Sequence, residues 1–338
     1  MPSITKVSTP SSGAISFADL NAALRNTAGT EVSLGDGDVK SLLGVSSGSV
    51  DMNSAYGAFL PYGEVVYSTS NGTNTNGPYT FTNCDFGTDT DDRIILCVVT
   101  YYALYGNADS SSNYSLDTIA SATIGGVSAT CAGRMDGYTV SSSTGHRQQM
   151  CVFYARPTGT IGSVVYSVNN VGWDNGLSYR AGHGRTLTIY ALYGLNNTNP
   201  IEYSTHTQKT DGTDGTYNLQ ITLSPDTSDN QKDKLLLLLT GRHYIDGSPP
   251  TDNYFYINSS TKTSDWQEPS TSSIEGQGAL GYLTNDVPTT STFTANSVTT
   301  DGSTSSVDLE TTCFIGIILA KNPSSTQTVS FAPSATYS

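Results

Sequence analysis

Two apolar runs with the same lead-in constrain this chain more than any other feature. The segments Asp92–Val99 and Asp233–Leu239 each open with an acidic and a basic residue and continue as unbroken apolar sequence. A short, continuous apolar run is typical of a strand buried on both faces. We therefore expect a duplicated β-structure in which each copy has one such strand at its centre.

The surroundings of the two runs repeat as well. An acidic, Thr-rich loop precedes each run, at residues 85–92 and 226–233, and similar apolar strands close the two copies at residues 188–194 and 314–320. No helix-length periodic segment lies between the predicted strands, which favours a β-sandwich over an α/β fold. The sequence leaves open whether the region forms one large sandwich or two.

Local patterns support this class. Leu187, Ile189 and Ala191 alternate with polar residues, as in a strand with one buried face. The segment 124–127 (Ile-Gly-Gly-Val) predicts a tight turn between short strands. The predicted fold is mainly β: a small N-terminal α+β docking module (residues 1–62), then a jelly-roll-like β-sandwich region with internal duplication, first half 63–198 and second half 199–338. The polar C-terminal tail is expected along the surface or on a neighbouring subunit.

Residues 11–57 carry a different repeat. A short apolar phrase begins at Ala14, Glu31 and Ser49, about 17 residues apart, and each copy predicts a short strand leading into a short helix. Ser16 and Asp19 have capping-box spacing in the first copy. Asp36 or Asp38 can cap the second helix, and Asp51 can cap a single turn in the third.

Each copy carries an apolar stripe too small to form a core alone. Three copies together give about ten core side chains, which is marginal for a free domain. We therefore expect the stripes to bury against a partner. The predicted docking residues are Phe17, Leu20, Leu24, Val39, Leu42, Leu43, Met52 and Tyr56. The alternative is a small cap packed on the following domain.

The order Gly-x-Ile-Ser-Phe-x-Asp-Leu, a middle Val-Ser-Leu and a closing Ser-Ser-Gly-x-x-x-Met-x-x-x-Tyr-Gly resembles an N-terminal module of tailed-bacteriophage virion proteins, mostly tail fibres and other appendages. The resemblance covers about 50 residues and implies docking onto a larger virion component. Ala55 departs from it, since an aromatic residue is expected before Tyr56. Residues 92 to about 197 also resemble a β-sandwich domain of phage structural proteins, which supports the fold more than the role.

Composition narrows the partners. The chain of 338 residues has 13% charged residues and a formal net charge of −14. Nucleic acid and anionic membranes both require a basic face, so neither is expected as a partner. The five cysteines form no Cys-x-x-Cys pair and mostly lie in apolar runs, which predicts buried, reduced thiols. The N-terminus has no apolar core typical of a signal peptide.

No strong catalytic motif is present, so we expect no catalytic residues, metal or cofactor. Glu268 with Glu275, or Asp246 with Asp252, would suit a glycosidase only if the two carboxylates converge. The acidic loop at 85–92 offers oxygen ligands for calcium but lacks the spacing of an EF-hand, and a solvated loop is the favoured interpretation.

Trp173 and Trp266 are the candidate glycan contacts, because flat aromatic faces beside polar side chains can hold sugars. Several tyrosines, among them Tyr254 and Tyr256, can add to such a surface. The alternative for both tryptophans is a place in the core or in a subunit interface.

These observations predict a non-enzymatic virion protein, most readily a tail fibre or a baseplate or tail appendage, located in the virion after assembly in the host cytoplasm. Its expected partners are other virion proteins of the baseplate, tail or neck, further copies of itself with a trimer first, and a host-surface glycan. The alternatives are a capsid-decorating or head-tail collar protein and, from another class, a carbohydrate-binding module or polysaccharide depolymerase.

Overall fold

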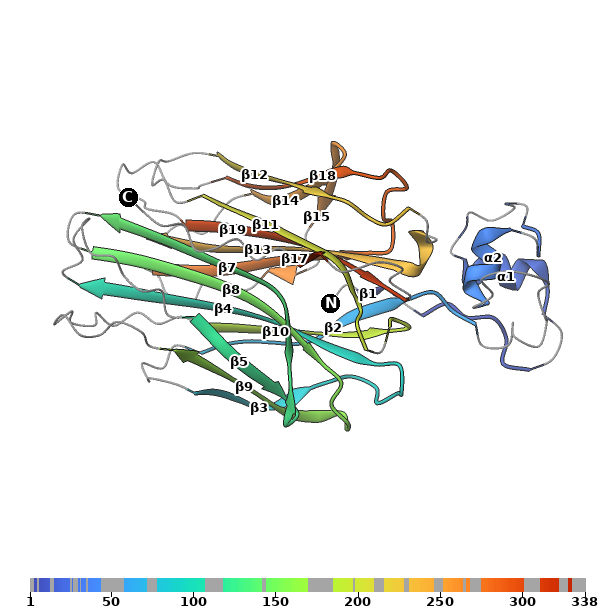
Figure 1. Cartoon of the computed structure of the whole chain (residues 1–338), viewed down its shortest axis with the longest axis horizontal. Helices are drawn as coiled ribbons and strands as arrows, with labels where there is room; N and C mark the ends of the chain where they lie inside the picture. Colours follow the sequence, from blue (N-terminus) through green and yellow to red (C-terminus); the bar gives the residue numbers. More distant parts are fainter. Residues whose placement is uncertain are drawn as a thin grey trace.

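The computed structural model describes residues 3–4, 6–12, 15–24, 26, 30, 32–34, 36–43, 58–71, 78–106, 118–141, 144–169, 185–196, 198–209, 216–227, 231–245, 252–263, 266–267, 275–300, 311–321 and 328–329. Within these residues the chain is mainly β, as predicted. Four sheets, antiparallel except for one short pair of strands, form stacked layers, and a pair of short helices stands at one end of the stack (Figure 1).

The first half of the body supplies two of the four sheets. Its strands are β2 (Tyr62–Asn71), β3 (Tyr79–Asp85), β4 (Ile94–Gly106), β5 (Thr118–Ile124), β6 (Val127–Ser128), β7 (Thr130–Ser141), β8 (Thr144–Ala155), β9 (Ile161–Asn169) and β10 (Arg185–Tyr193). One sheet has the order β2-β10-β4-β8-β7, and the other has the order β3-β9-β5-β6.

The second half supplies the other two sheets. Its elements are β11 (Ile201–Lys209), β12 (Thr216–Leu223), the 3-10 turn η2 (Gln231–Asp233), β13 (Lys234–Ile245), β14 (Asp252–Ile257), β15 (Ser260–Thr263), β16 (Trp266–Gln267), β17 (Glu275–Thr284), β18 (Phe293–Thr300) and β19 (Thr311–Ala320). The sheet orders are β11-β19-β13-β17-β16 and β12-β18-β14-β15.

These orders are the same in both halves when the strands are counted from β2 and from β11. In each half, successive strands also pass between the two sheets in the same order. This is the arrangement of a jelly roll with one extra edge strand. Internal duplication is therefore confirmed at the level of topology. The predicted counterparts agree: the runs beginning at Ile94 and Leu235 start β4 and β13, and the closing strands are β10 and β19.

The equivalent hairpins show the repeat in detail. Gly125 and Gly126, with φ of 58° and 80°, turn β5 into β6, as the Ile-Gly-Gly-Val segment predicted. Asn258 and Ser259, with φ of 45° and 69°, make the same turn between β14 and β15. Positive φ at both central positions is the requirement of a type I′ turn, whose twist matches that of the paired strands.

The stacked sheets enclose three apolar cores. One core lies inside each jelly roll, and the third lies between the two jelly rolls, where Ile94, Leu96 and Val98 of β4 share a cluster with Leu235 and Leu237 of β13. Alternate residues of β4, such as Ile95 and Cys97, face the core of the first jelly roll. Both central strands are thus covered on both faces, because two sandwiches share a middle core. This answers the question that the sequence left open.

The chain termini extend the middle sheets. β1 (Ser3–Ile4) pairs with β2, and Ile4 packs on the middle core, so the first residues belong to the body although they lie within the predicted N-terminal module. β20 (Thr328–Val329), from the predicted surface tail, pairs in parallel with β11. These two short strands lie on equivalent edge strands of the two halves. The helices are α1 (Phe17–Ala23) and α2 (Gly37–Leu42).

Candidate attachment site

The helical module begins with the predicted capping box. The Ser16 hydroxyl accepts a hydrogen bond from the Asp19 amide at 3.2 Å, and the Asp19 carboxylate accepts one from the Ser16 amide at 2.7 Å. The Ser16 hydroxyl also donates to the Asp19 carboxylate at 2.7 Å, and this bond, followed by the one from the Ser16 amide, lowers the pKa of Asp19 from its ordinary value. α1 therefore starts where the sequence predicts, because two otherwise unsatisfied amide donors find acceptors.

The second copy repeats this bond. The Asp36 carboxylate accepts from the Ser33 amide at 2.7 Å, the distance found in the first copy, and α2 begins at Gly37 directly after Asp36. Of the two candidate caps, Asp36 is thus the one that precedes the helix. The third copy, with Asp51, Met52 and Tyr56, lies outside the described residues.

The apolar stripes of the two helices pack on each other. Five predicted docking residues are buried in one cluster with Ala23 and Leu60; they are Leu20, Leu24, Val39, Leu42 and Leu43, with exposed fractions of 8% or less. The prediction that these five side chains remain open for a partner is therefore wrong. Two helices facing each other, closed by Leu60 from the following segment, already remove them from water. The Phe17 side chain is outside the described set.

The half-buried apolar residues of the module lie at its edge. Ile15, Val32 and Leu34 pack against the same cluster but remain partly accessible. Ile15 and Val32 occupy the same position in the first and second copies of the repeated phrase, immediately before Ser16 and Ser33. The phrase that defines the repeat is therefore the part of the module that still offers apolar surface.

A narrow stem connects the module to the body. Ser8 and Phe59 form an isolated antiparallel bridge, and the Thr9 amide donates to the Ala58 carbonyl at 3.0 Å. The Ala58 amide in turn donates to the Thr9 hydroxyl at 3.0 Å. The chain leaves and re-enters the body at one point, so the module is an inserted segment whose two ends are paired with each other (Figure 1).

Aromatic side chains fasten the stem to the first jelly roll. The Lys6 ammonium lies 4.1 Å from the centre of the Phe59 ring, Phe59 meets Tyr62 edge-on, and Tyr62 stacks on Tyr193 at 4.6 Å. The Tyr193 hydroxyl accepts from the Thr88 amide at 3.1 Å. Burial, with smaller contributions from nearby Tyr193 and carboxylates, raises the pKa of Tyr62 to about 12. These contacts join the stem to the first jelly roll.

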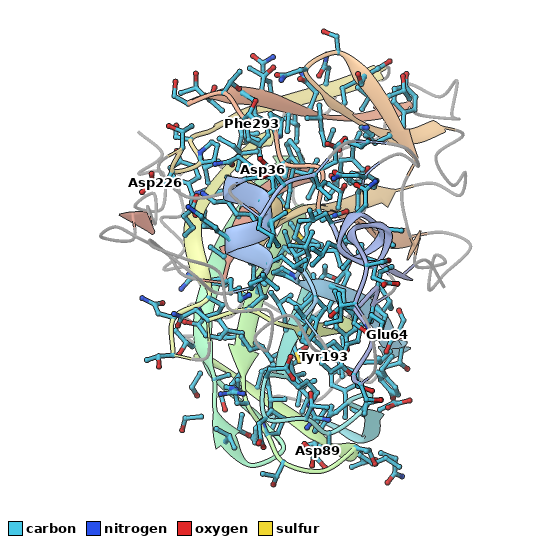
Figure 2. All side chains as sticks on the ribbon, turned by 90° about the vertical axis from the view of Figure 1, so that its right-hand side faces the viewer. Asp36, Glu64, Asp89, Tyr193, Asp226 and Phe293 are labelled. Atoms are coloured by element: carbon cyan, nitrogen blue, oxygen red, sulfur yellow. The ribbon has the colours of Figure 1, made fainter. Side chains whose placement is uncertain are left out.

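Figure 2 looks onto the end of the body that carries the module. Asp36 lies in the upper half of this view, just below Phe293 of the second jelly roll, and Asp89 of the first lies at the bottom. α2 also contacts η2, just before the central strand of the second jelly roll. The module thus stands over the end of the stack where strands of both jelly rolls turn.

The carboxylates of the acidic loop at 85–92 accept hydrogen bonds from other groups of the same chain. Asp89 accepts from the Arg93 guanidinium at 2.9 Å and from the Gly159 amide at 2.6 Å, and Asp92 accepts from the Gly194 amide at 3.0 Å. Asp85 accepts from the Gly87 amide at 2.7 Å. In the described part of the chain, no three acidic, His or Cys side chains gather as a metal site. The carboxylates instead join the loops at the end of the first jelly roll.

The remaining candidates are placed only in part. Trp173, Asp246 and Glu268 lie outside the described residues, so the structure tests neither predicted carboxylate pair. Trp266 pairs through its backbone with Gly281 of β17. None of the five cysteines forms a disulfide: Cys84, Cys97, Cys151 and Cys313 are buried, and Cys131 is half-buried.

One set of polar side chains is marked by no motif in the sequence. Its members are Asn218 and Gln220 of β12 and Asn296 of β18. In the structure, the three carboxamides are hydrogen-bonded in series across β12 and β18, beside Tyr256 of β14. Strand alternation indicates the exposed side of β12, but cross-strand register, which the sequence does not supply, decides which exposed residues meet.

Comparison with protein-family models gives no match, and comparison with curated proteins gives none either. Among solved structures, the ANX2 ectodomain from Arabidopsis thaliana is matched over 76% of this chain and 83% of that chain, at 8% identity and a TM-score of 0.16. Similarity at this level carries no argument about fold or function. Within the described ranges, no helix has the length and hydropathy needed to cross a membrane.

Proposed function

We propose that this chain is a non-enzymatic structural protein of a tailed-phage virion, a tail fibre or a baseplate or tail appendage. The observation that carries the proposal is a small helical module joined to the end of a duplicated β-body by a two-stranded stem (Figure 1). The body joins its acidic loops internally, and its low charge content suits a durable displayed surface. The module carries the phrases on which the resemblance to phage attachment modules rests.

The structure changes the docking mechanism within this proposal. The apolar stripes of the two helices are buried in the module's own cluster. Docking therefore uses the apolar surface of the module that remains accessible. Ile15, Val32 and Leu34 supply half-buried apolar area there. Burying these side chains against a partner stabilises the complex by roughly 25 cal/mol for each Å² of apolar area removed from water. A homo-oligomer, trimer first, is the expected displayed form.

Removal of the module tests the proposal. The Thr9 amide and the Ala58 carbonyl lie 3.0 Å apart, so residues 11–57 can be replaced by a short Gly-Ser link without stretching the stem. Tagged full-length and shortened chains would be expressed during infection, and purified particles would be probed for each. We expect the full chain in the particles and the shortened chain, although folded, outside them. Equal incorporation of both chains, or absence of the full chain, would contradict the proposal.

A capsid-decorating or collar protein is the second candidate, favoured by the jelly-roll order, which is common among viral capsid domains. Copy number per particle separates the two. A decorating protein is present in copies comparable to the capsid protein, whereas a fibre or appendage is present in far fewer. Quantitative mass spectrometry of purified particles gives the ratio.

A further inference from the structure

A row of polar and aromatic residues crosses the outermost sheet of the second jelly roll. Gln220 of β12 is opposite Asn296 of β18, Asn296 is opposite Tyr256 of β14, and Tyr256 is opposite Thr261 of β15. Gln220 and Thr261 are exposed, and Asn296 and Tyr256 are half-buried. Four adjacent strands span roughly 14 Å at the usual strand spacing, so the row is long enough for an extended ligand.

The carboxamides of this row are linked and only partly used. Asn296 Nδ2 donates to Asn218 Oδ1 at 2.8 Å, and Gln220 Nε2 donates to Asn296 Oδ1 at 3.4 Å. Each carboxamide has two N–H donors and an oxygen that accepts two bonds. The linkage fixes the orientation of the three groups and leaves further donors and acceptors for a ligand.

Two tyrosines lie beside the carboxamides. Tyr254 and Tyr256 are two residues apart on β14 and therefore face the same side of the sheet. Their ring centres are 5.1 Å apart and their planes are nearly perpendicular, at 89°. The pair braces both rings edge to face, an arrangement that limits ring motion without covering both ring faces.

The first jelly roll shows what the fold itself requires at these positions. Its equivalent row, aligned by the matching hairpin turns, is Thr80, Val165, Thr123 and Ser128. These are small β-formers with neither a carboxamide nor an aromatic ring. The same sheet thus folds without the groups found in the second jelly roll, so their presence there calls for a reason other than folding.

We propose that the outer face formed by Asn218, Gln220, Asn296, Tyr254, Tyr256 and Thr261, the amide–tyrosine face, binds a neutral glycan. None of the six residues is charged, which disfavours phosphate backbones and acidic sugars. The exposed polar groups disfavour a protein partner, whose contact needs an apolar centre. Carboxamides match sugar hydroxyls as donors and acceptors, and tyrosine rings match the C–H faces of pyranoses. The assignment deepens the host-surface part of the proposed function and rests on it for its biological role.

The test uses the purified full chain, fluorescently labelled, on an array of immobilised neutral and acidic oligosaccharides. We expect binding to a set of neutral glycans. Tyr256→Ala and Asn296→Ala each weaken it about tenfold or more, through loss of a stacking face or of the central carboxamide. Tyr256→Phe keeps the ring and stays close to wild type. Thr123→Ala and Val165→Ala, at the equivalent positions of the first jelly roll, leave binding unchanged.

Three outcomes overturn the proposal: no neutral glycan bound by the wild type, binding to acidic glycans alone, or equal binding by wild type, Tyr256→Ala and Asn296→Ala. Unfolding midpoints are measured for every variant, and the exposed Gln220→Ala replaces any variant that fails to fold. Glycan binding by the isolated chain is independent of particle incorporation. A chain that binds glycan but is absent from particles refutes the virion role alone, and an incorporated chain without glycan binding refutes this face alone.

Discussion

The two jelly rolls hold the basic residue at the start of their central strand in different ways. Arg93 and Lys234 are equivalent, and both side chains are almost fully buried. Arg93 donates to four backbone carbonyls and to Asp89, whose side chain is 43% exposed. Lys234 instead faces the buried carboxylate of Glu202, at 2.7 Å and 2.8 Å from its two oxygens, and the Asp226 carbonyl.

The difference shows that a buried cation at this position can be satisfied either by several backbone carbonyls or by one buried carboxylate. The planar guanidinium has five donors and satisfies several carbonyls at once, so it needs little opposite charge. The ammonium is a compact charge that requires a nearby anion when buried. Both cations contact the loop before the central strand, Arg93 through Asp89 and backbone carbonyls and Lys234 through the Asp226 carbonyl.

The largest expected effect comes from Lys234→Ala. The substitution leaves the Glu202 carboxylate buried without its cation, and we expect a loss of about 3–5 kcal/mol in the free energy of unfolding. Guanidinium unfolding of the full chain measures it. The matched variant Lys234→Met with Glu202→Leu removes both charges and should recover most of the loss. If the double variant is as unstable as the single one, the ion pair is not the cause.

Arg93→Ala should cost less, about 2–3 kcal/mol, although it removes more hydrogen bonds. Two of the four carbonyl acceptors belong to the half-buried residues Gly87 and Gly159, where water can replace the guanidinium, and Asp89 is already 43% exposed. The same unfolding experiment gives the value. Asp89→Asn is the control and should cost under about 1 kcal/mol, because partly exposed ion pairs contribute little. An Arg93→Ala loss larger than that of Lys234→Ala would invert the comparison.

Gly316 of β19 marks a place where the second jelly roll packs more closely than the first. A Cβ there would lie 2.5 Å from Ile221 Cδ1, whereas the equivalent residue of β10 is Ile189. Gly316→Ala should therefore cost about 1–3 kcal/mol through overpacking. Ile221→Val removes the obstructing methyl group and should restore part of the loss when combined with it. Additive losses in the double variant would exclude this clash.

The smallest expected effect concerns the stem, where only the first jelly roll has the stacked pair Tyr62 and Tyr193. Burial raises the pKa of Tyr62 to about 12, above the ordinary value of 10. The neutral ring is favoured in the folded state, so its contribution is complete below pH 10 and is lost as the pH rises toward 12. Stability should fall less steeply over this interval in Tyr62→Phe than in the wild type, by thermal unfolding. Parallel curves would show that Tyr62 does not titrate with folding.

The sequence by itself determined the class of the body and its duplication. A strand made of an unbroken apolar run, such as Ile94 to Val99, removes its side chains from water only when both of its faces are covered. The repeated acidic loop before each run located both central strands. The Ser16–Asp19 box also located the start of α1, because capping depends on residues three positions apart. These features depend on residues that are close together in the sequence, so the sequence alone is enough to predict them.

Tertiary structure alone decided which surfaces remain free. The stripe residues Leu20, Leu24 and Val39 look available in the sequence, yet two helices and Leu60 enclose them, because burial depends on which elements meet rather than on periodicity. The shared middle core likewise depends on two sheets stacking. The amide–tyrosine face depends on register across four strands separated by up to about eighty residues, and no local pattern encodes such a register.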